Sequence, residues 1–317
     1  MEWFKAIFVN GERTPPPFAD ATIPFVIPAI AISNTNTFIV SEVAKYDSKI
    51  SFRCNYFGVE YIITLKNIYA DKRIIYNNLL SHRGKMLVLS DNGNPIIVFI
   101  GPHVNFFALD NKIIGSIASS GAAFVRNNAV YVVNSGHLIE NTFKTIKNKI
   151  IHQAKNVQNI TNIAFQVCDG LIIQDLLGRK YISIPYALNK CLNKYIPQLD
   201  NYRIIDAKSE KNVTVIIGER GGVYNRFILV FDSNFLYFNV REVKDINYDA
   251  INFTVLETGL CVLLSNADEV ELFKSNQSLK TINSPPFDST MKLFDRNGKV
   301  FFINNDTVFS VSTIATN

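Results

Sequence analysis

Apolar runs of about five residues recur along the chain in pairs, and a short polar turn separates the two runs of each pair. The clearest copy starts at Gly298, where an apolar run to residue 304 is followed by a second, alternating run over residues 307–312. β-Branched and aromatic residues dominate these runs, and such residues favour strands. Alternation beside a short polar turn is typical of a β-hairpin. The chain is therefore predicted to consist mainly of strands.

The hairpin pattern occurs seven times. Successive copies begin 36 to 47 residues apart, and the mean spacing is about 42 residues. The first residues of the copies are Ser48, Gly84, Asn128, Gly170, Asn212, Gly259 and Gly298. A further apolar stretch precedes each pair, such as residues 160–165 or 251–256, and another often follows it, such as residues 235–240. Each unit thus has room for about four strands, the size of one blade in a ring of sheets.

A four-stranded sheet with two apolar faces cannot bury both by itself. Stacking each sheet against its neighbours covers the faces, and closing the series into a ring removes the uncovered end sheets. We therefore predict an all-β fold, a seven-bladed β-propeller with about 42 residues and four strands per blade, in which residues 37–317 form a single domain. The alternatives are six or eight blades, a pair of β-sandwiches, or an open solenoid. Sandwiches have similar turn spacings but do not predict the longer repeat.

Residues 1–36 precede the repeat. They are expected to form an N-terminal segment that completes or braces a blade, as an outer strand beside residues 307–312. Residues 38–40 are assigned instead to the first strand of the first copy. The triple proline at residues 15–17 offers an alternative, in which this segment reaches a partner.

Two inserts carry a spacing compatible with helices. Within residues 142–157, Ile146, Ile150 and Ile151 fall on one helical face, and the lysines lie mostly elsewhere. Within residues 187–195, apolar residues recur at three- and four-residue intervals. Both inserts are predicted to be helical.

Composition and charge limit the possible functions. Apolar residues make up 48% of the chain and charged residues 19%, which is the balance of a folded protein. The net charge of +5 is smaller than a dedicated nucleic-acid binder usually carries. The N-terminus has no signal-peptide pattern, and the apolar run over residues 21–32 is too short to cross a bilayer. A cytoplasmic location without membrane contact is expected.

The sequence carries no recognisable catalytic motif. Nucleotide-binding glycine patterns, the nucleophile elbow and the zinc-protease motif are all absent from the sequence. The four cysteines and four histidines show no metal-ligand spacing, and the cysteines are expected to be buried free thiols. The stretches expected to line a central channel, residues 113–117, 162–165 and 252–255, are poor in titratable groups. We therefore expect no enzyme activity, no cofactor and no metal.

Two polar segments are candidates for contact with a partner. Glu219 and Arg220 stand in what is expected to be a long turn between apolar runs, and loops on rigid scaffolds often carry binding residues. The alternative is a plain flexible turn. The other candidate is the basic insert with Lys144, Lys147, Lys149 and Lys155, which could contact an acidic surface or a phosphate backbone. A solvated charged face is the simpler alternative there.

The sevenfold pattern resembles the β-propeller superfamily without the signatures of its best-known branches. The only tryptophan is Trp3, so the Trp-Asp repeats of WD40 proteins are missing. The paired glycine of kelch repeats occurs once, at residues 221–222, and the Gly-Gln-Leu-Gly of the regulator-of-chromosome-condensation type is absent. The resemblance implies a rigid platform, and no functional residue is transferred from it.

The functional prediction follows from a regular ring without a catalytic motif. We predict a non-catalytic protein–protein interaction scaffold, a propeller subunit that holds protein partners in a larger assembly. The first alternative is a nucleic-acid-contacting subunit that uses the basic inserts. The second is an enzyme or small-ligand binder with its site in the central channel.

Overall fold

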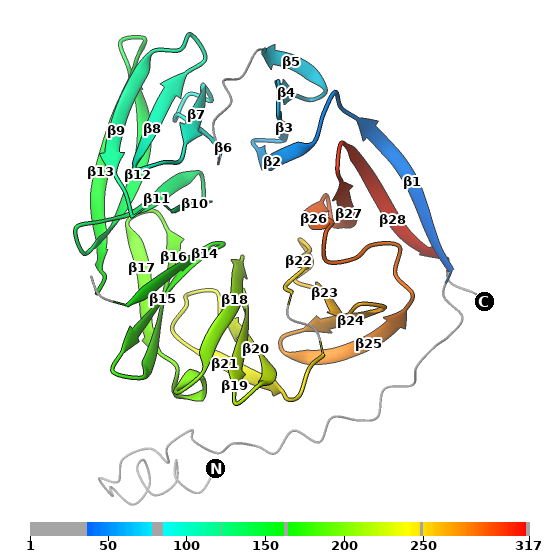
Figure 1. Cartoon of the computed structure of the whole chain (residues 1–317). Helices are drawn as coiled ribbons and strands as arrows, with labels where there is room; N and C mark the ends of the chain where they lie inside the picture. Colours follow the sequence, from blue (N-terminus) through cyan, green and yellow to red (C-terminus); the bar gives the residue numbers. More distant parts are fainter. Residues whose placement is uncertain (1–36, 78–84, 121, 162–163, 248–249, 315–317) are drawn as a thin grey trace, which may run out of the picture. The chain divides into compact units, whose positions relative to one another are not determined.

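The computed structural model describes residues 37–77, 85–120, 122–161, 164–247 and 250–314. These residues form seven four-stranded antiparallel sheets arranged in a ring (Figure 1). The predicted seven-bladed, all-β architecture is confirmed. The predicted role of residues 1–36 as a bracing segment lies outside the described residues and stays a prediction.

Six blades are each built from four consecutive strands, ordered from the inner strand outwards. Blade 1 contains β2 (Ile50–Tyr56), β3 (Val59–Thr64), β4 (Ile68–Ala70) and β5 (Arg73–Tyr76). Blade 2 contains β6 (Lys85–Leu89), β7 (Pro95–Phe99), β8 (His103–Ala108) and β9 (Ile113–Ala118). Blade 3 contains β10 (Ala123–Arg126), β11 (Ala129–Asn134), β12 (His137–Ile146) and β13 (Lys149–Asn159).

The remaining blades follow the same order until the last. Blade 4 contains β14 (Phe165–Cys168), β15 (Leu171–Leu176), β16 (Arg179–Ala187) and β17 (Lys190–Tyr195), followed by the short 3₁₀ helix η1 (Pro197–Leu199). Blade 5 contains β18 (Arg203–Glu210), β19 (Val213–Arg220), β20 (Val223–Phe231) and β21 (Phe238–Val243). Blade 6 contains β22 (Phe253–Val255), β23 (Cys261–Asn266), β24 (Glu269–Lys274) and β25 (Gln277–Asn283).

Blade 7 closes the ring with strands from both ends of the described chain. It contains β26 (Lys292–Arg296), β27 (Lys299–Asn304), β28 (Thr307–Ile314) and, outermost, β1 (Thr37–Lys45). The assignment of residues 38–40 to the first copy is therefore wrong, because these residues pair with β28. Their apolar pattern suits an outer strand of one blade as well as an inner strand of the next. Only the closure of the ring distinguishes the two.

The hairpin signature does not cover the same pair of strands in every blade. In blades 1 and 2 the hairpin signature falls on the first and second strands, whereas in the other five blades it falls on the second and third. As a result, residues 113–117, expected on an inner strand, lie in the outer strand β9. The error has a simple cause: any two adjacent strands buried between blades produce the same apolar hairpin pattern.

Both predicted helices are wrong. Residues 142–157 lie in the paired strands β12 and β13, and most of residues 187–195 lie in β17. Lys147 and Asn148 have φ angles of 49° and 62°, which end any helix and form a two-residue hairpin turn. The isoleucines that suggested a helical face are divided between the two faces of the hairpin.

The hydrophobic core lies between the blades. Val88, Ile96 and Val98 of blade 2 pack with Val130 and Val132 of blade 3. The corresponding clusters recur at the other blade boundaries. This packing is the reason that single sheets of this sequence need neighbours, as the sequence predicted.

Candidate functional site

The hairpin of β12 and β13 is the longest pair of strands in the described chain. Their register runs from Ile146 opposite Lys149, beside the turn, to His137 opposite Asn159. We call residues 137–159 the blade-3 hairpin. Four of the predicted partner-binding residues, Lys144, Lys147, Lys149 and Lys155, all lie in it.

One face of the blade-3 hairpin is anchored on blade 2. Phe143 packs edge-on against Phe106, and the His152 ring lies 4.8 Å from that of Phe106. His152 Nε2 is 2.8 Å from Asn141 Oδ1, and burial lowers the pKa of His152. Gly115 of β9 fits closely here, since a Cβ on it would lie 2.4 Å from His152 Nδ1. The half of the hairpin nearer the turn is therefore held against blade 2, which sets its orientation.

The opposite face of the blade-3 hairpin is exposed, basic and partly apolar. Because cross-strand partners share a face, Lys144 lies beside Ile151 and Ile146 beside Lys149. Both isoleucines are strongly exposed, Ile146 at 50% and Ile151 at 41%. Lys155 continues the same face toward the root. We call this surface the basic hairpin face.

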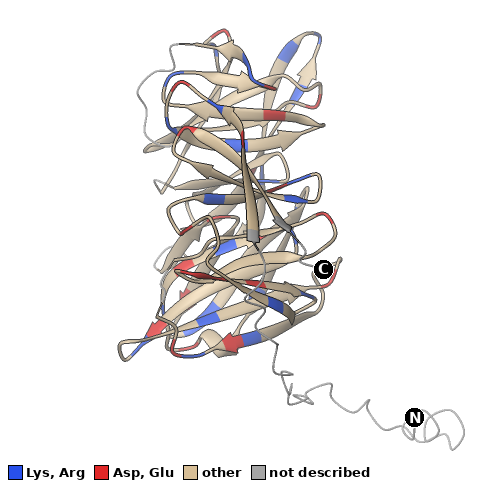
Figure 2. Ribbon diagram, turned by 90° about the vertical axis from the view of Figure 1, so that its right-hand side faces the viewer, with Lys and Arg blue, Asp and Glu red and all other residues tan. Residues whose placement is uncertain are grey.

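The lysines of this face have few acidic residues near them, and Glu140, which lies opposite Lys155, is engaged with other groups. The sequence contains no Asp or Glu between Asn141 and Cys168. Glu140, the nearest carboxylate in the hairpin, is buried and accepts hydrogen bonds from the Tyr131 hydroxyl at 2.8 Å and the Asn189 amide. Within the described residues, no ion pair involves Lys144 or Lys149. Elsewhere basic and acidic residues are interspersed (Figure 2).

The other predicted candidates, Glu219 and Arg220, lie in blade 5 and are held by their own blade. The expected long turn is instead a two-residue turn at Gly221 and Gly222, and β19 continues through Arg220. Glu219 accepts a hydrogen bond from Gly222 N at 2.7 Å and pairs with Arg203 at 3.0 Å. The Arg220 guanidinium lies 4.9 Å from the Tyr202 ring centre. The structure does not bring these two residues into the blade that carries the lysines.

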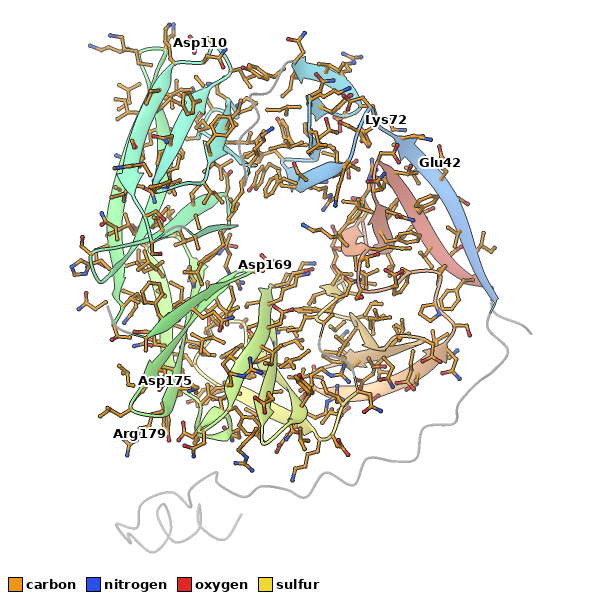
Figure 3. All side chains as sticks on the ribbon, in the orientation of Figure 1. Glu42, Lys72, Asp110, Asp169, Asp175 and Arg179 are labelled. Atoms are coloured by element: carbon orange, nitrogen blue, oxygen red, sulfur yellow. The ribbon has the colours of Figure 1, made fainter. Side chains whose placement is uncertain are left out.

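A second candidate site is the central channel, a cavity of about 1530 Å³ lined by six of the seven inner strands. Its lining includes six basic and four acidic residues: Arg53, Lys85, Arg126, Lys208, Lys211, Lys292, Asp169, Asp206, Glu210 and Asp295. The expectation that the inner strands are poor in titratable groups is therefore wrong. In Figure 3 Asp169 lies toward the centre of the ring, whereas Asp110, Lys72, Glu42, Asp175 and Arg179 lie at its outer rim.

Several basic residues of the channel donate hydrogen bonds to backbone carbonyls of other blades. An inner strand has one unpaired edge, whose carbonyls need donors. Arg126 of blade 3 donates to Ser209 O at 2.9 Å and to Lys211 O at 2.5 Å, both in blade 5. It also reaches Gly170 O at 3.4 Å. Burial lowers the pKa of Arg126 to about 10.

Two lysines continue this pattern around the ring. Lys208 donates to Phe253 O of blade 6 at 2.7 Å and pairs with Glu210 at 3.0 Å. Lys211 donates to Val255 O at 2.6 Å and pairs with Asp295 of blade 7 at 3.1 Å. These charges thus link blades to one another.

The seam between the first and last blades has its own charged cluster. Glu60 of blade 1 is buried and pairs with Arg53 at 3.2 Å and with Arg296 of blade 7 at 3.3 Å. The Arg53 guanidinium also lies 4.0 Å from the ring centre of Phe294. This cluster joins the two blades at which the ring closes.

The remaining channel groups do not form a recognisable reaction centre. Burial raises the pKa of Asp206. Its carboxylate oxygens accept hydrogen bonds from the backbone amides of Ala207 and Ile251. Among the described residues, no group of three or more His, Cys, Asp or Glu side chains is placed to hold a metal ion. The basic channel residues described above instead stabilise the ring.

The four cysteines are free thiols. Cys261 is buried, as expected, whereas Cys54, Cys168 and Cys191 are half-buried. Burial raises the pKa of all four thiols, to about 12 for Cys168 and Cys191. A raised pKa keeps a thiol protonated and weakly nucleophilic at neutral pH.

Comparison with solved structures places the architecture. The chain is similar to a chain in the S. cerevisiae structure of Dbp5 bound to Nup159, Gle1, IP6 and ADP, at 10% identity and a TM-score of 0.52, covering 89% of this chain and 96% of that one. The chain therefore has the β-propeller fold. A weaker likeness is Kluyveromyces lactis Hsv2p, at 12% identity and a TM-score of 0.49, covering 85% of this chain and 98% of that one. Another is BBS1N in complex with ARL6DN, at 9% identity and a TM-score of 0.48, covering 88% of this chain and 96% of that one.

This propeller has no recognisable sequence relatives in the other comparisons. No protein-family model and no curated protein sequence matches it. Nor does any helix in the described part of the propeller have the length and apolarity needed to span a membrane.

Proposed function

We propose that this propeller is a non-catalytic interaction scaffold that binds a protein partner through the basic hairpin face. The observation that carries the proposal is the combination of exposed Lys144 and Lys149 with exposed Ile146 and Ile151 on one rigid two-stranded surface. Apolar area supplies affinity, and unpaired charges at its margin supply orientation and association rate. The partner surface is acidic.

The neighbouring rim of blade 4 extends this surface. β17 contacts β13, and the turn before β17 carries Leu188, which is 58% exposed. The sequence from Leu176 to Leu199 contains no Asp or Glu, and Lys190 is exposed. A specific interface takes about 800 Å² from each partner, more than one hairpin face offers, so we expect both rims to contribute.

The central channel fits a structural role better than a catalytic one. Arg126, Lys208 and Lys211 are engaged with carbonyls of other blades and with Asp295 or Glu210. The S. cerevisiae structure with the similar fold is itself an assembly of several proteins, which agrees with a scaffold role. Glu219 and Arg220 remain a second predicted contact, on a different blade.

The test is recovery of the partner by affinity purification from the native source. Lys144, Lys147, Lys149 and Lys155 are replaced by glutamate in one variant. A matched control replaces four exposed lysines of other blades, Lys66, Lys244, Lys274 and Lys299, so that the net charge changes equally. We expect a stoichiometric protein to be lost from the first variant and retained by the control.

A nucleic-acid role would give a different result. Nucleic acid that co-purifies, is released by nuclease and is lost steeply with rising salt would support the alternative use of the lysines. Equal loss of the protein partner from both variants would contradict the proposed site, because it would show sensitivity to total charge only.

A further inference from the structure

Among the described strands, none lies beside the outer edge of β13. β13 is the last strand in the order β10-β11-β12-β13, and its eleven residues make it the longest strand of the described chain. Its register is regular from Lys149 to Asn156, since the only shift lies near the root, beside Leu138. Other outer strands are shorter, and β1, with nine residues, is interrupted by a bulge. An edge of this length is a ready template for another strand.

The turn geometry identifies which backbone groups point outwards. In a two-residue hairpin the residues flanking the turn, here Ile146 and Lys149, form a hydrogen-bonded pair. Hydrogen-bonded and non-hydrogen-bonded pairs then alternate. Two contacts confirm this phase: Thr145 N donates to Asp91 Oδ1 at 2.7 Å, and Phe143 O accepts from Asp91 N at 3.0 Å. Neither group is therefore bonded to β13.

The alternation assigns the outward amides and carbonyls to Ile150, His152, Ala154 and Asn156, which oppose the non-hydrogen-bonded positions of β12. In the described part of the chain, no other backbone or side-chain group bonds these outward atoms. The inner strand edges differ from the β13 edge, because Arg126 and Lys211 donate hydrogen bonds to carbonyls there. The β13 edge remains available for pairing.

We propose that an extended acidic segment of a partner protein binds the β13 edge as a fifth strand of blade 3. This inference rests on the proposed function and specifies how the partner is held. Backbone hydrogen bonds to the four outward residues give affinity, and side chains of the added strand lie alternately on the two faces. Acidic side chains on the face shared with Lys149 and Lys155 then meet opposite charges at cross-strand distance.

Two other occupants can be distinguished from an acidic strand, the first by its charge and the second by its use of the backbone amides. A second copy of this chain, paired through the same edge, would bring Lys149 and Lys155 of one copy close to those of the other, and like charges across strands are destabilising. Nucleic acid would use the lysines but not the outward amides. Removal of one amide therefore separates a protein strand from a polyanion.

The experiment uses the full chain and a fluorescent eight-residue peptide of alternating Glu and Val, which places all its carboxylates on one face of a strand. Ala154 is replaced by proline, which removes one outward amide and leaves the pairing with β12 intact, because proline is tolerated on an edge whose N–H faces solvent. The matched control is Ala154→Val. We expect Ala154→Pro to weaken peptide binding about tenfold, as the loss of one or two hydrogen bonds implies. We expect Ala154→Val to bind within about twofold of the parent.

A second measurement protects the test against misfolding. The melting temperature of Ala154→Pro should stay within about 2 °C of the parent. The same peptide with N-methyl groups on all its valines, or on all its glutamates, is then titrated onto the unmodified chain. One of the two should lose binding, and which one does so reports an antiparallel or a parallel added strand.

The outcomes separate this inference from the proposed function. Equal binding to the alternating peptide, to a Glu-Glu-Val-Val peptide of the same composition and to both N-methylated peptides would overturn strand addition. If Ala154→Pro still recovers the native partner while the four-lysine variant does not, the proposed site holds and strand addition is wrong. Loss of partner from neither variant overturns both.

Discussion

Gly170 provides a sharp test of how the inner strands are packed. It occupies the turn between β14 and β15 with a φ of +82°, and a Cβ there would lie 2.3 Å from Ser209 O of the next blade. Gly58 occupies the equivalent turn between β2 and β3 with the same φ of +82°, and a Cβ there would have no atom within 4 Å. The two glycines thus differ in surroundings and share a backbone conformation.

Replacing each glycine with alanine separates two contributions to stability. The left-handed backbone costs about 1 kcal/mol in either variant. Gly170→Ala must in addition displace a carbonyl that Arg126 holds at 2.9 Å, and such overpacking adds about 2 kcal/mol. We expect a loss of about 1 kcal/mol for Gly58→Ala and about 3 kcal/mol for Gly170→Ala. For a chain of this size these losses lower the melting temperature by about 1.5 °C and about 4.5 °C.

The assay is urea unfolding followed by far-ultraviolet circular dichroism, with the slope compared between variants to confirm that the same surface is exposed. Equal destabilisation by the two substitutions would refute the reasoning, because it would mean that blades 4 and 5 do not approach each other closely at Gly170. A smaller effect at Gly170 than at Gly58 would refute it more strongly.

Three further predictions concern the charged and titratable groups. Glu60→Gln leaves Arg53 and Arg296 without a carboxylate and should lower the free energy of unfolding in urea by about 3 kcal/mol. Asp110→Asn removes an exposed pair with Lys112 and should change the free energy of unfolding by less than about 0.5 kcal/mol. Equal effects would show that the seam cluster is solvated. Arg126→Met keeps about the same side-chain volume but removes the donors to Ser209 O and Lys211 O, so we expect the free energy of unfolding to fall by about 2 kcal/mol in the same assay. Arg179→Met is the exposed control. An unchanged stability of Arg126→Met would mean that water replaces the guanidinium. Burial lowers the pKa of His152 in the folded chain below its unfolded value, so the fold favours the neutral ring. The stability that the neutral ring contributes is complete above about pH 6.5. This stability is lost as the pH falls through that value toward the folded pKa. The difference between the pH–stability curves of the parent and His152→Gln should therefore change below about pH 6.5, and curves that stay parallel there would contradict this assignment.

The ring itself follows from the sequence. Seven copies of an apolar hairpin, spaced by about 42 residues, are enough to predict stacked four-stranded sheets, since each sheet has two faces that water would otherwise cover. The four lysines of the blade-3 hairpin were also recognised as a group from the sequence, because Lys144, Lys147, Lys149 and Lys155 lie close together in the chain. Their charge excess depends only on local sequence.

The tertiary structure alone decided two features of the strands, and a third, the charged channel, is described below. The same apolar residues suit a helix or a hairpin, and the positive φ angles at Lys147 and Asn148 settled the matter in favour of strands. The place of residues 38–40 depended on where the ring closes, which no local pattern encodes.

The charged channel is the clearest case of a feature hidden from the sequence. Arg126 and Lys211 are 85 residues apart, and their contact exists only because the blades between them curve round a common axis. Sequence periodicity reports which faces of a strand are apolar, whereas the partners of an unpaired strand edge are set by how sheets meet in space. The hairpin pattern thus determined that this chain forms blades, and the geometry of closure decided which charges link those blades and which remain exposed at the rim.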